Sequence, residues 1–301
     1  MSVLEDKIKE VRPNLSKNSI KTYNSILKNL YYRGYPDDKD IDIKKFGNVK
    51  HFVNVLKETD PIQRKTYYSA LLIISNDKDK EEYKNLMLND IHQYNNFINE
   101  NKKNDKEKEN WLSQNEIIKI RDSLKPMFNY VLKKDNINID DLQKAQQYII
   151  ICLYTMIEPR RLLDYVNMLY TKPKNISEED NYIDKNVFIF NKYKTSKFYK
   201  SQNIEIPKEL LKILKQWISF IKKNCPNNNY LLFDSNCNKL NVVQLNQRLN
   251  KIFGKKISVN MLRHIYITNE LNKPISNLKE LKESSKHMGH SLQTHLEYIK
   301  N

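Results

Sequence analysis

The spacing of apolar residues changes character only once along this 301-residue chain, and that change limits the fold more than any other feature. In most stretches apolar side chains recur every three to four residues, as on one face of a helix; Ile20, Ile26 and Leu30 are an early example. Between Val187 and Pro207 the residues instead follow the short apolar runs and alternation of β strands. The spacing therefore predicts a mainly helical α+β fold with one small β-hairpin or sheet.

The helical spacing predicts individual helices as well as the fold class. Ser16 or Asn18 can cap the first helix, and Pro159 ends or kinks the fifth. The expected helices cover residues 20–30, 67–74, 81–97, 111–131, 140–157, 210–221, 241–253, 260–272 and 278–287. The β interval predicts two strands, 187–190 and 204–206, joined by a polar and basic turn over 191–203.

Residues 101–110 contain no apolar side chain, so burial cannot offset the entropy cost of ordering them. A charged linker at this place would separate a helical unit, residues 1–100, from a second unit, residues 111–301. A solvated helix end is the alternative interpretation of the same ten residues. The length of the chain suits two domains, each with its own core.

The chain carries 52 Lys and Arg against 36 Asp and Glu, a formal charge of +16. This excess favours a polyanionic partner, although charge alone leaves nucleic acid, a membrane surface and acidic proteins open. There are only four glycines, and no GxGxxG or GxxxxGK[ST] string occurs. Nucleotide-binding folds that hold phosphate in a glycine-rich loop therefore lose their main support.

Cysteines and apolar runs bear on the compartment. Cys152, Cys225 and Cys237 are odd in number and have no CxxC spacing, so we expect three reduced thiols and no cysteine-based zinc site. The N-terminal residues include no apolar signal region, and no run approaches the roughly 20 apolar residues of a membrane span. We therefore expect an intracellular protein, in the nucleus or cytoplasm of a host cell, with no membrane partner.

Four short strings carry the residue types of a phosphate-processing site. They are PRRLLDY at 159–165, YKTSK at 193–197, NMLRH at 260–264 and MGHS at 288–291, and Tyr298 follows the last one. Each string has a plain structural interpretation by itself: a helix cap or ion pair, a solvated turn, a helix ion pair, and a helix C-cap with a satisfied histidine. Their order along the chain is the informative feature.

In this order the strings resemble the signature of the tyrosine recombinases, the integrase family of phages, viruses and mobile elements. The family pattern is Arg, Lys, His-x-x-Arg, Gly-His and Tyr. The strings are most similar to those of integrases from virophages and large DNA viruses. Leu15 to Tyr23 also resembles the opening of the family's core-binding domain, so the resemblance covers nearly the whole chain.

The resemblance implies an architecture and a partner. Residues 1–100 would form a helical, SAM-like core-binding domain and residues 111–301 the catalytic domain, closing together as a C-shaped clamp around double-stranded DNA. Binding would depend steeply on salt, because contacts to phosphate dominate such affinity. The chain would self-associate, as a tetramer on paired sites, and the reaction would need no metal, ATP or other cofactor.

The resemblance also implies five catalytic roles. Arg161 and Arg263 would stabilise charge on the phosphate oxygens, which guanidinium groups bind as planar forks. Lys194 would protonate the leaving 5′ oxygen, His290 would donate a hydrogen bond, and Tyr298 would form a 3′-phosphotyrosyl link. Three further residues are predicted to bind DNA: Arg160, Lys197 and Lys200.

Two departures from the family pattern concern the same site. Asn260 stands where the family has its first histidine; an amide can donate a hydrogen bond to phosphate but cannot transfer a proton. Acid and base work would then fall on Lys194 and His290, or on His264. The interval from His290 to Tyr298 is also one residue shorter than is common in the family.

Two other functions remain open on the sequence. A type IB DNA topoisomerase would use the same chemistry, but would relax supercoiled DNA without joining two sites. A catalytically degenerate, architectural DNA-binding protein would bind duplex DNA without a covalent adduct. A basic protein that binds membranes is less well supported, because no long, basic amphipathic helix stands out.

Overall fold

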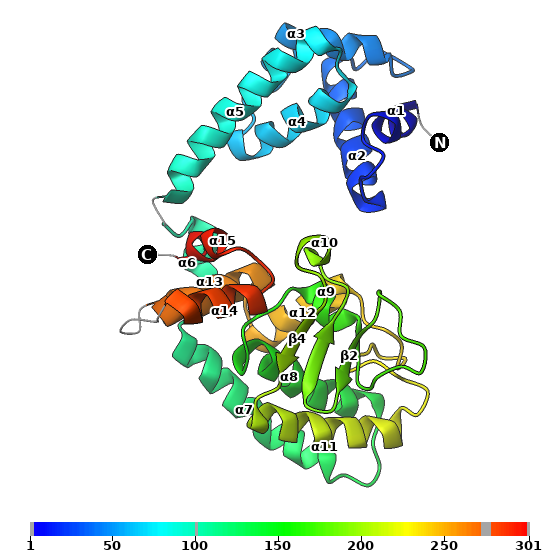
Figure 1. Cartoon of the computed structure of the whole chain (residues 1–301), viewed down its shortest axis with the longest axis vertical. Coiled ribbons are helices and arrows are strands. Elements are labelled where there is room, and N and C mark those ends of the chain that lie inside the picture. Colours follow the sequence, from blue (N-terminus) through cyan, green and yellow to red (C-terminus); the bar gives the residue numbers. More distant parts are fainter. Residues whose placement is uncertain (1–2, 100–101, 272–277, 300–301) are drawn as a thin grey trace. The chain divides into compact units, whose positions relative to one another are not determined.

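The computed structural model describes residues 3–99, 102–271 and 278–299, and its elements form two compact units (Figure 1). Residues 1–100 are the N-terminal unit and residues 101–301 the C-terminal unit. Helices dominate both, and one four-stranded sheet lies in the C-terminal unit. The predicted α+β class, mainly α with a small sheet, is confirmed.

The N-terminal unit is a bundle of helices. Its elements are α1 (Val3–Val11), α2 (Lys17–Gly34), the 3-10 helix η1 (Ile43–Gly47), α3 (Val49–Val55), α4 (Pro61–Ile74) and α5 (Asp77–Asn99). Ser16 caps α2 by accepting a hydrogen bond from the Ser19 amide at 3.1 Å. The three helices expected in this region are all present.

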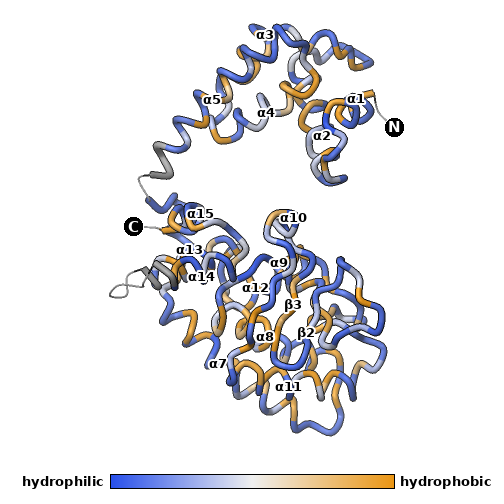
Figure 2. The backbone as a smooth tube through the Cα atoms, viewed as in Figure 1, coloured by the Kyte–Doolittle hydropathy of each residue, from blue (hydrophilic) through white to orange (hydrophobic). Residues whose placement is uncertain are grey.

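The core of this bundle comes from the apolar faces of its helices. Leu27 and Leu30 of α2, Phe52 of α3 and Leu71 of α4 are fully buried. Figure 2 shows the apolar positions recurring along the helices among hydrophilic ones, as amphipathic helices require.

The C-terminal unit contains further helices before and after its sheet. They are α6 (Asp105–Asn110), α7 (Gln114–Leu132), α8 (Ile139–Thr155), α9 (Leu162–Val166), α10 (Ser196–Tyr199), α11 (Lys208–Asn224), α12 (Val242–Phe253), α13 (Val259–Leu271), α14 (Leu278–His287) and α15 (Leu292–Glu297). The expected helices of this region correspond to α7, α8, α11, α12, α13 and α14. Residue 272 of one expected helix lies outside the described residues.

The sheet has the strand order β1-β2-β3-β4, from β1 (Met168–Leu169), β2 (Asn181–Asp184), β3 (Val187–Phe190) and β4 (Gln202–Glu205). The predicted hairpin is present: β3 and β4 pair antiparallel with Val187 opposite Glu205 and Phe190 opposite Gln202. The strands β1 and β2 were not predicted, because two to four residues with polar ends give no clear alternation.

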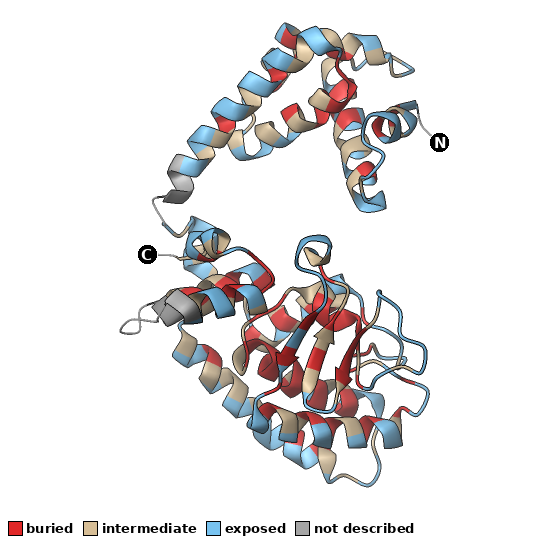
Figure 3. Cartoon of the chain, viewed as in Figure 1, coloured by how far each residue is buried: buried red, intermediate tan, exposed pale blue. Residues whose placement is uncertain are grey.

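Helix α8 is the centre of the C-terminal core. Its residues from Tyr148 to Tyr154 are all buried, which explains why their sequence is apolar on every face. The Gln146 side chain, on the same helix, donates to the Phe233 carbonyl and accepts from the Phe233 amide, at 3.0 and 2.7 Å. Figure 3 shows buried residues concentrated in the sheet and the helices beneath it.

The segment expected to be a charged linker contains a short helix. Asn104 and Glu107 form a capping box at the start of α6, which supplies local order without burial. Residue 101 lies outside the described residues. The assignment of residues 1–100 and 111–301 to two functional domains remains a prediction.

The cysteines differ from expectation. Cys225 and Cys237 form a disulfide with their Cα atoms 6.2 Å apart, so the expectation of three reduced thiols is wrong for this pair. The chain after α11 returns on itself and brings together two cysteines without any motif spacing. Cys152 is free, and burial raises the pKa of its thiol to about 12.

Candidate active site

Four segments that are distant in sequence meet at the turn between α14 and α15. The Gly289 carbonyl accepts hydrogen bonds from Arg161 Nη1 at 3.2 Å and from Thr195 Oγ1 at 2.8 Å. The Met288 carbonyl accepts one from Arg263 Nη1 at 3.2 Å. The fold therefore brings the four predicted strings together, since the carbonyls of one turn serve a side chain from each of the other three.

The conformation of Gly289 is the reason that this turn favours glycine. Its φ of 69° lies in the left-handed region, which residues with a Cβ rarely adopt. A Cβ at this position would lie 3.4 Å from the Tyr193 ring and 3.6 Å from Arg160 Nη2, which are ordinary van der Waals distances. The backbone conformation, and not the space available, therefore disfavours other residues here.

Arg263, on α13, is fully buried at the centre of the cluster. Its Nη1 also donates to the Pro159 carbonyl at 2.9 Å, and its Nη2 lies 2.6 Å from His290 Nδ1. Its Nε is buried without a hydrogen-bond partner. Burial lowers the pKa of Arg263, and interactions with Tyr298 oppose that shift. The guanidinium is thereby fixed in orientation by three acceptors.

Two histidines continue the hydrogen-bonded chain away from Arg263. A guanidinium only donates, so His290 Nδ1 must accept, and a neutral His290 then carries its proton on Nε2. That nitrogen lies 2.9 Å from His295 Nδ1, and His295, which is fully buried, has its Nε2 left without a partner. The direction of donation from Arg263 through His290 to His295 is therefore fixed.

Both histidines are held neutral. Burial, together with the charge of Arg263, lowers the pKa of His290 to about 2 and that of His295 to about 4. A ring with so low a pKa is a poor proton acceptor. His290 can position Arg263, or donate through Nε2 if it releases His295, but it is unsuited to act as a base.

Tyr298 follows α15 and contacts three of the other predicted site residues. Its ring centroid lies 4.5 Å from that of His264, 5.3 Å from that of His290 and 5.1 Å from the Arg263 guanidinium carbon. His264 Nδ1 lies 2.7 Å from the Tyr298 carbonyl and donates to it. The tyrosine is partly exposed and covers the buried arginine and histidine.

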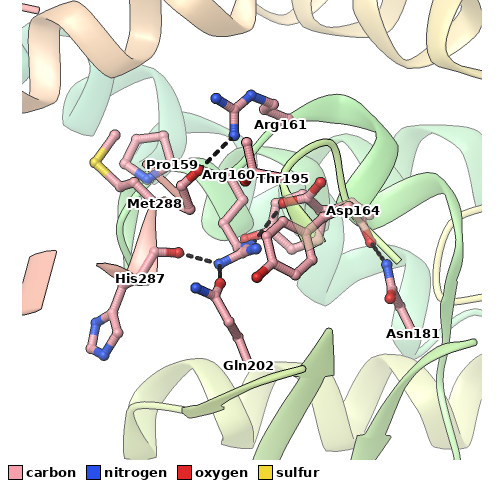
Figure 4. A network of polar contacts seen from close by, with 12 residues as sticks. Pro159, Arg160, Arg161, Asp164, Asn181, Thr195, Gln202, His287 and Met288 are labelled. Carbon is pink, nitrogen blue, oxygen red and sulfur yellow. Dashed lines mark hydrogen bonds and ion pairs between the residues drawn. The ribbon is translucent and has the colours of Figure 1, made fainter. Parts of the chain in front are cut away.

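Arg160 has a different place from the one predicted. Its side chain is fully buried, donates from Nε to Asp164 at 2.8 Å and from Nη1 to Gln202 at 2.9 Å, and also bonds the His287 carbonyl (Figure 4). Burial raises the pKa of Asp164 against the opposing charge of Arg160. Arg160 joins α9, β4 and α14 from within, so it is not at the surface as a DNA contact requires.

The remaining predicted residues are at the surface. Lys194, Lys197, Lys200 and Asn260 are all exposed, and none of their side chains has a hydrogen bond or ion pair within the described part of the chain. Lys194 lies beside Thr195, whose hydroxyl binds the Gly289 carbonyl, so its backbone is fixed next to the site. Asn260 shares α13 with Arg263 and His264.

Three residues of the cluster were given no role by the sequence. Thr195 anchors the β3–β4 turn, Gln202 binds Arg160, and His295 holds the proton of His290. His295 could have been noticed as a second histidine five residues after His290, but such a pair has no known motif. The contact of Thr195 with Gly289 joins residues 94 positions apart, and that of Gln202 with Arg160 joins residues 42 positions apart.

Within residues 3–99, 102–271 and 278–299, no group of three or more His, Cys, Asp or Glu side chains is arranged to hold a metal ion. In the same part of the chain, no helix has both the length and the apolar character needed to cross a membrane.

No protein-family model matches this chain, and neither does any curated protein sequence. Two solved structures are similar in fold. The first is the crystal structure of XerA recombinase, at 13% identity and a TM-score of 0.43, covering 99% of this chain and 93% of that one. The second is XerH site-specific recombinase bound to difH substrate in a pre-cleavage complex, at 14% identity and a TM-score of 0.41, covering 98% and 90%. At such low scores, neither likeness by itself indicates what this chain does.

Proposed function

We propose that this chain is a tyrosine recombinase that cuts and rejoins duplex DNA through a 3′-phosphotyrosyl intermediate. One observation carries the proposal: the Tyr298 ring packs against Arg263, His264 and His290, while Arg161 binds the turn that holds His290. These residues come from separate elements and match the order of the family signature. A cluster with only a structural role has no need of a partly exposed tyrosine over a buried cation.

The proposed reaction exchanges one phosphodiester bond for another. The Tyr298 oxygen bonds to phosphorus as the bond from phosphorus to the 5′ oxygen breaks, and Lys194 gives that oxygen a proton. The phenol proton goes to His264, whose ring packs on Tyr298, because the lowered pKa of His290 makes His290 unsuited to accept it. Rejoining reverses these steps, so the bond energy is conserved without ATP.

Arg161 and Arg263 would stabilise the charge that develops on the phosphate oxygens. Arg161 is partly exposed and can meet a phosphate directly. Arg263 is fully buried under Tyr298, so a phosphate reaches it only if Tyr298 and the adjoining residues move aside. His290 or the amide of Asn260 would add hydrogen bonds once DNA is bound.

The partner in this proposal is double-stranded DNA. The excess of basic side chains supports it, as do the exposed Lys194, Lys197 and Lys200 on the β3–β4 turn. Residues 1–100 would serve as a core-binding domain and residues 111–301 as the catalytic domain, forming a clamp on the duplex. Four copies would assemble on two paired sites.

Covalent trapping tests the proposal. A nicked suicide duplex of mixed sequence, in which the released strand diffuses away, should leave wild-type protein attached to DNA after denaturation. Tyr298→Phe should leave no adduct, whereas Tyr130→Phe, which changes an exposed tyrosine on α7 of the same unit, should leave it intact. An adduct with Tyr298→Phe equal to that of wild type would overturn the assignment of the nucleophile.

The same assay separates the alternative functions. Duplex binding without any adduct would indicate an architectural protein, an outcome that the burial of Arg263 would then explain. An adduct with relaxation of supercoiled plasmid, and no joining of two sites, would indicate a type IB topoisomerase.

A further inference from the structure

Phe198 is displayed to solvent more fully than any other large hydrophobic side chain in the described part of the chain. The residue is 83% exposed, against 65% for Val3 and 62% for Tyr130. It lies on α10, in the turn between β3 and β4 that projects from the C-terminal unit in Figure 1. A phenyl ring in water lacks the free energy that its burial would contribute. Such an exposed apolar side chain is expected where a partner covers it.

The turn that carries Phe198 is held in place at its base. The buried Tyr193 donates its hydroxyl to the Lys200 carbonyl at 2.7 Å, and Ser201 Oγ lies 2.7 Å from Asn191 Oδ1 across the turn. Thr195 adds the bond to the Gly289 carbonyl at 2.8 Å. The exposure of Phe198 is thus a feature of an anchored turn, not of a loose loop.

The charged residues that neighbour Phe198 in the sequence are all basic. Residues 191–203 contain four lysines and no acidic residue, and Lys194, Lys197 and Lys200 are exposed. Glu178 and Glu179 line a hollow of about 610 Å³ beside the turn together with Lys192, Lys197 and Lys200, and Glu179 pairs with Lys192; Phe198 does not line this hollow. The tip therefore combines an exposed apolar ring with exposed lysines.

We propose that Phe198 is a wedge that enters the stack of base pairs beside the phosphate to be cut. This rests on the proposed function, because the same turn carries Lys194 and is bonded through Thr195 to the Gly289 that precedes His290. The lysines would bind phosphates on either side of a groove, and the ring would partly unstack one base step between them. An aromatic face stacks on any base, so the wedge adds affinity and distortion without reading sequence.

Substitution of Phe198 should separate this contact from the charge of the turn. Phe198→Ala removes no packing inside the unit, so the protein should fold as wild type. Its affinity for the nicked duplex should fall about tenfold, as expected when one base loses an aromatic partner. The slope of log affinity against log salt should stay unchanged, whereas Lys197→Gln should reduce that slope by about 0.9. Val243→Ala, at an exposed apolar position on α12, is the matched control and should change neither.

A fluorescent base reports the wedge directly. With 2-aminopurine placed beside the nick, wild-type protein should raise the fluorescence, because unstacking relieves quenching. Phe198→Ala should lose that rise, and Phe198→Trp should retain unstacking, visible as a changed circular dichroism of the base.

The outcomes distinguish failure of the wedge from failure of the function. If Phe198→Ala forms the adduct and unstacks the base as wild type does, the wedge is refuted and the recombinase stands. If the wild-type protein forms no adduct and leaves the base stacked, both the wedge and the recombinase function are refuted. If the substitution instead dissolves a dimer seen by light scattering, the ring contacts a second copy of the chain and the wedge is again refuted.

Discussion

The two units of this chain both have helical cores, but they differ in net charge and in how deeply they bury an ion pair. Residues 1–100 carry only two more basic than acidic side chains, whereas residues 101–301 carry fourteen more. Each unit buries one arginine–aspartate pair: Arg64–Asp90 in the first and Arg160–Asp164 in the second. The first pair keeps contact with water, since the Arg64 side chain is 21% exposed, and the second has none.

These differences in net charge and in burial of the ion pair indicate which unit is more sensitive to substitution. The N-terminal unit nearly balances its basic and acidic side chains. The C-terminal unit concentrates unbalanced cations and buries two arginines near one turn, an arrangement that costs desolvation and is expected at sites that bind anions. We therefore expect perturbations of the C-terminal unit to have the larger effects on stability and on DNA.

The largest expected effect is on the two buried ion pairs. Asp164→Ala leaves Arg160 buried and unpaired, so the free energy of unfolding of the C-terminal unit should fall by about 3–5 kcal/mol. Asp90→Ala should cost the N-terminal unit only about 1–3 kcal/mol, since Arg64 can turn toward water. Both tryptophans, Trp111 and Trp217, lie in the C-terminal unit, so their fluorescence in denaturant reports that unit and circular dichroism reports both. Equal losses would remove the contrast between the pairs.

The second effect concerns catalysis. Arg161→Ala should slow formation of the covalent adduct by about 10²–10³-fold, the usual cost of removing one donor that stabilises developing charge. Arg121→Ala removes an arginine of similar exposure, paired with Asp122 on α7, and should leave the rate unchanged. The measurement is single-turnover trapping with the nicked duplex. Similar slowing by both substitutions would mean that general positive charge, and not this site, governs the reaction.

The third effect is a dependence of stability on pH. His290 and His295 have lowered pKa values in the folded unit, about 2 and about 4, against 6.5 ordinarily. Below pH 6.5 the unfolded chain binds protons that the folded unit does not, so the free energy of unfolding falls as pH decreases toward 4. Between pH 7 and pH 5 the tryptophan-detected transition should lose about 4 kcal/mol, about 2 kcal/mol from each histidine.

The titration of His287 has the opposite effect on the stability of the C-terminal unit. Its hydrogen bond to Glu158, at 3.2 Å, raises its pKa, so its contribution is fully present below pH 6.5 and is lost as pH rises through the raised value. His287→Gln should therefore steepen the loss on acidification. A C-terminal unit equally stable at pH 7 and pH 5 in both proteins would contradict the buried, neutral histidine pair.

The smallest expected effect tests the role of His295 as a positioning residue. His295→Ala removes the acceptor that holds the proton on His290 Nε2, and adduct formation should slow about fivefold, the equivalent of one hydrogen bond. His295→Asn offers an oxygen in place of Nδ1 and should recover most of the rate. Nitrogen NMR should show His290 protonated on Nε2 in all three proteins, because Arg263 occupies Nδ1, and this proton should exchange with solvent faster in His295→Ala than in wild type and His295→Asn. An equal exchange rate in all three proteins would exclude this role.

Most of the fold could be predicted because its determinants are local. The apolar spacing of Ile20 to Leu30 needs only one helix face to be explained, and Ser16 caps that helix within its own turn. The β3–β4 hairpin was predictable for the same reason. The strands β1 and β2 were missed because their pairing, Met168 opposite Asn181, is set by the sheet and not by their own residues.

The structure brings together segments that the sequence could only list. The order along the chain suggested Arg161, Arg263, His290 and Tyr298 as one group, and their segments meet in the fold, while their catalytic roles stay predictions. Arg160 was expected at the surface and is buried. Two adjacent arginines have the same local sequence signal, and only packing decides which one turns inward to Asp164. The disulfide between Cys225 and Cys237 was missed because it depends on how the chain returns after α11.

By itself the sequence determined the helical character of the chain, the position of its hairpin and the residue types available for chemistry on a phosphate, because periodicity and residue chemistry are properties of short segments. The tertiary structure alone decided that Gly289 serves Arg161 and Thr195, that His295 fixes the proton of His290, and that Phe198 stands in water. These contacts join residues that are far apart in sequence or depend on burial, and both are settled only when the whole unit packs.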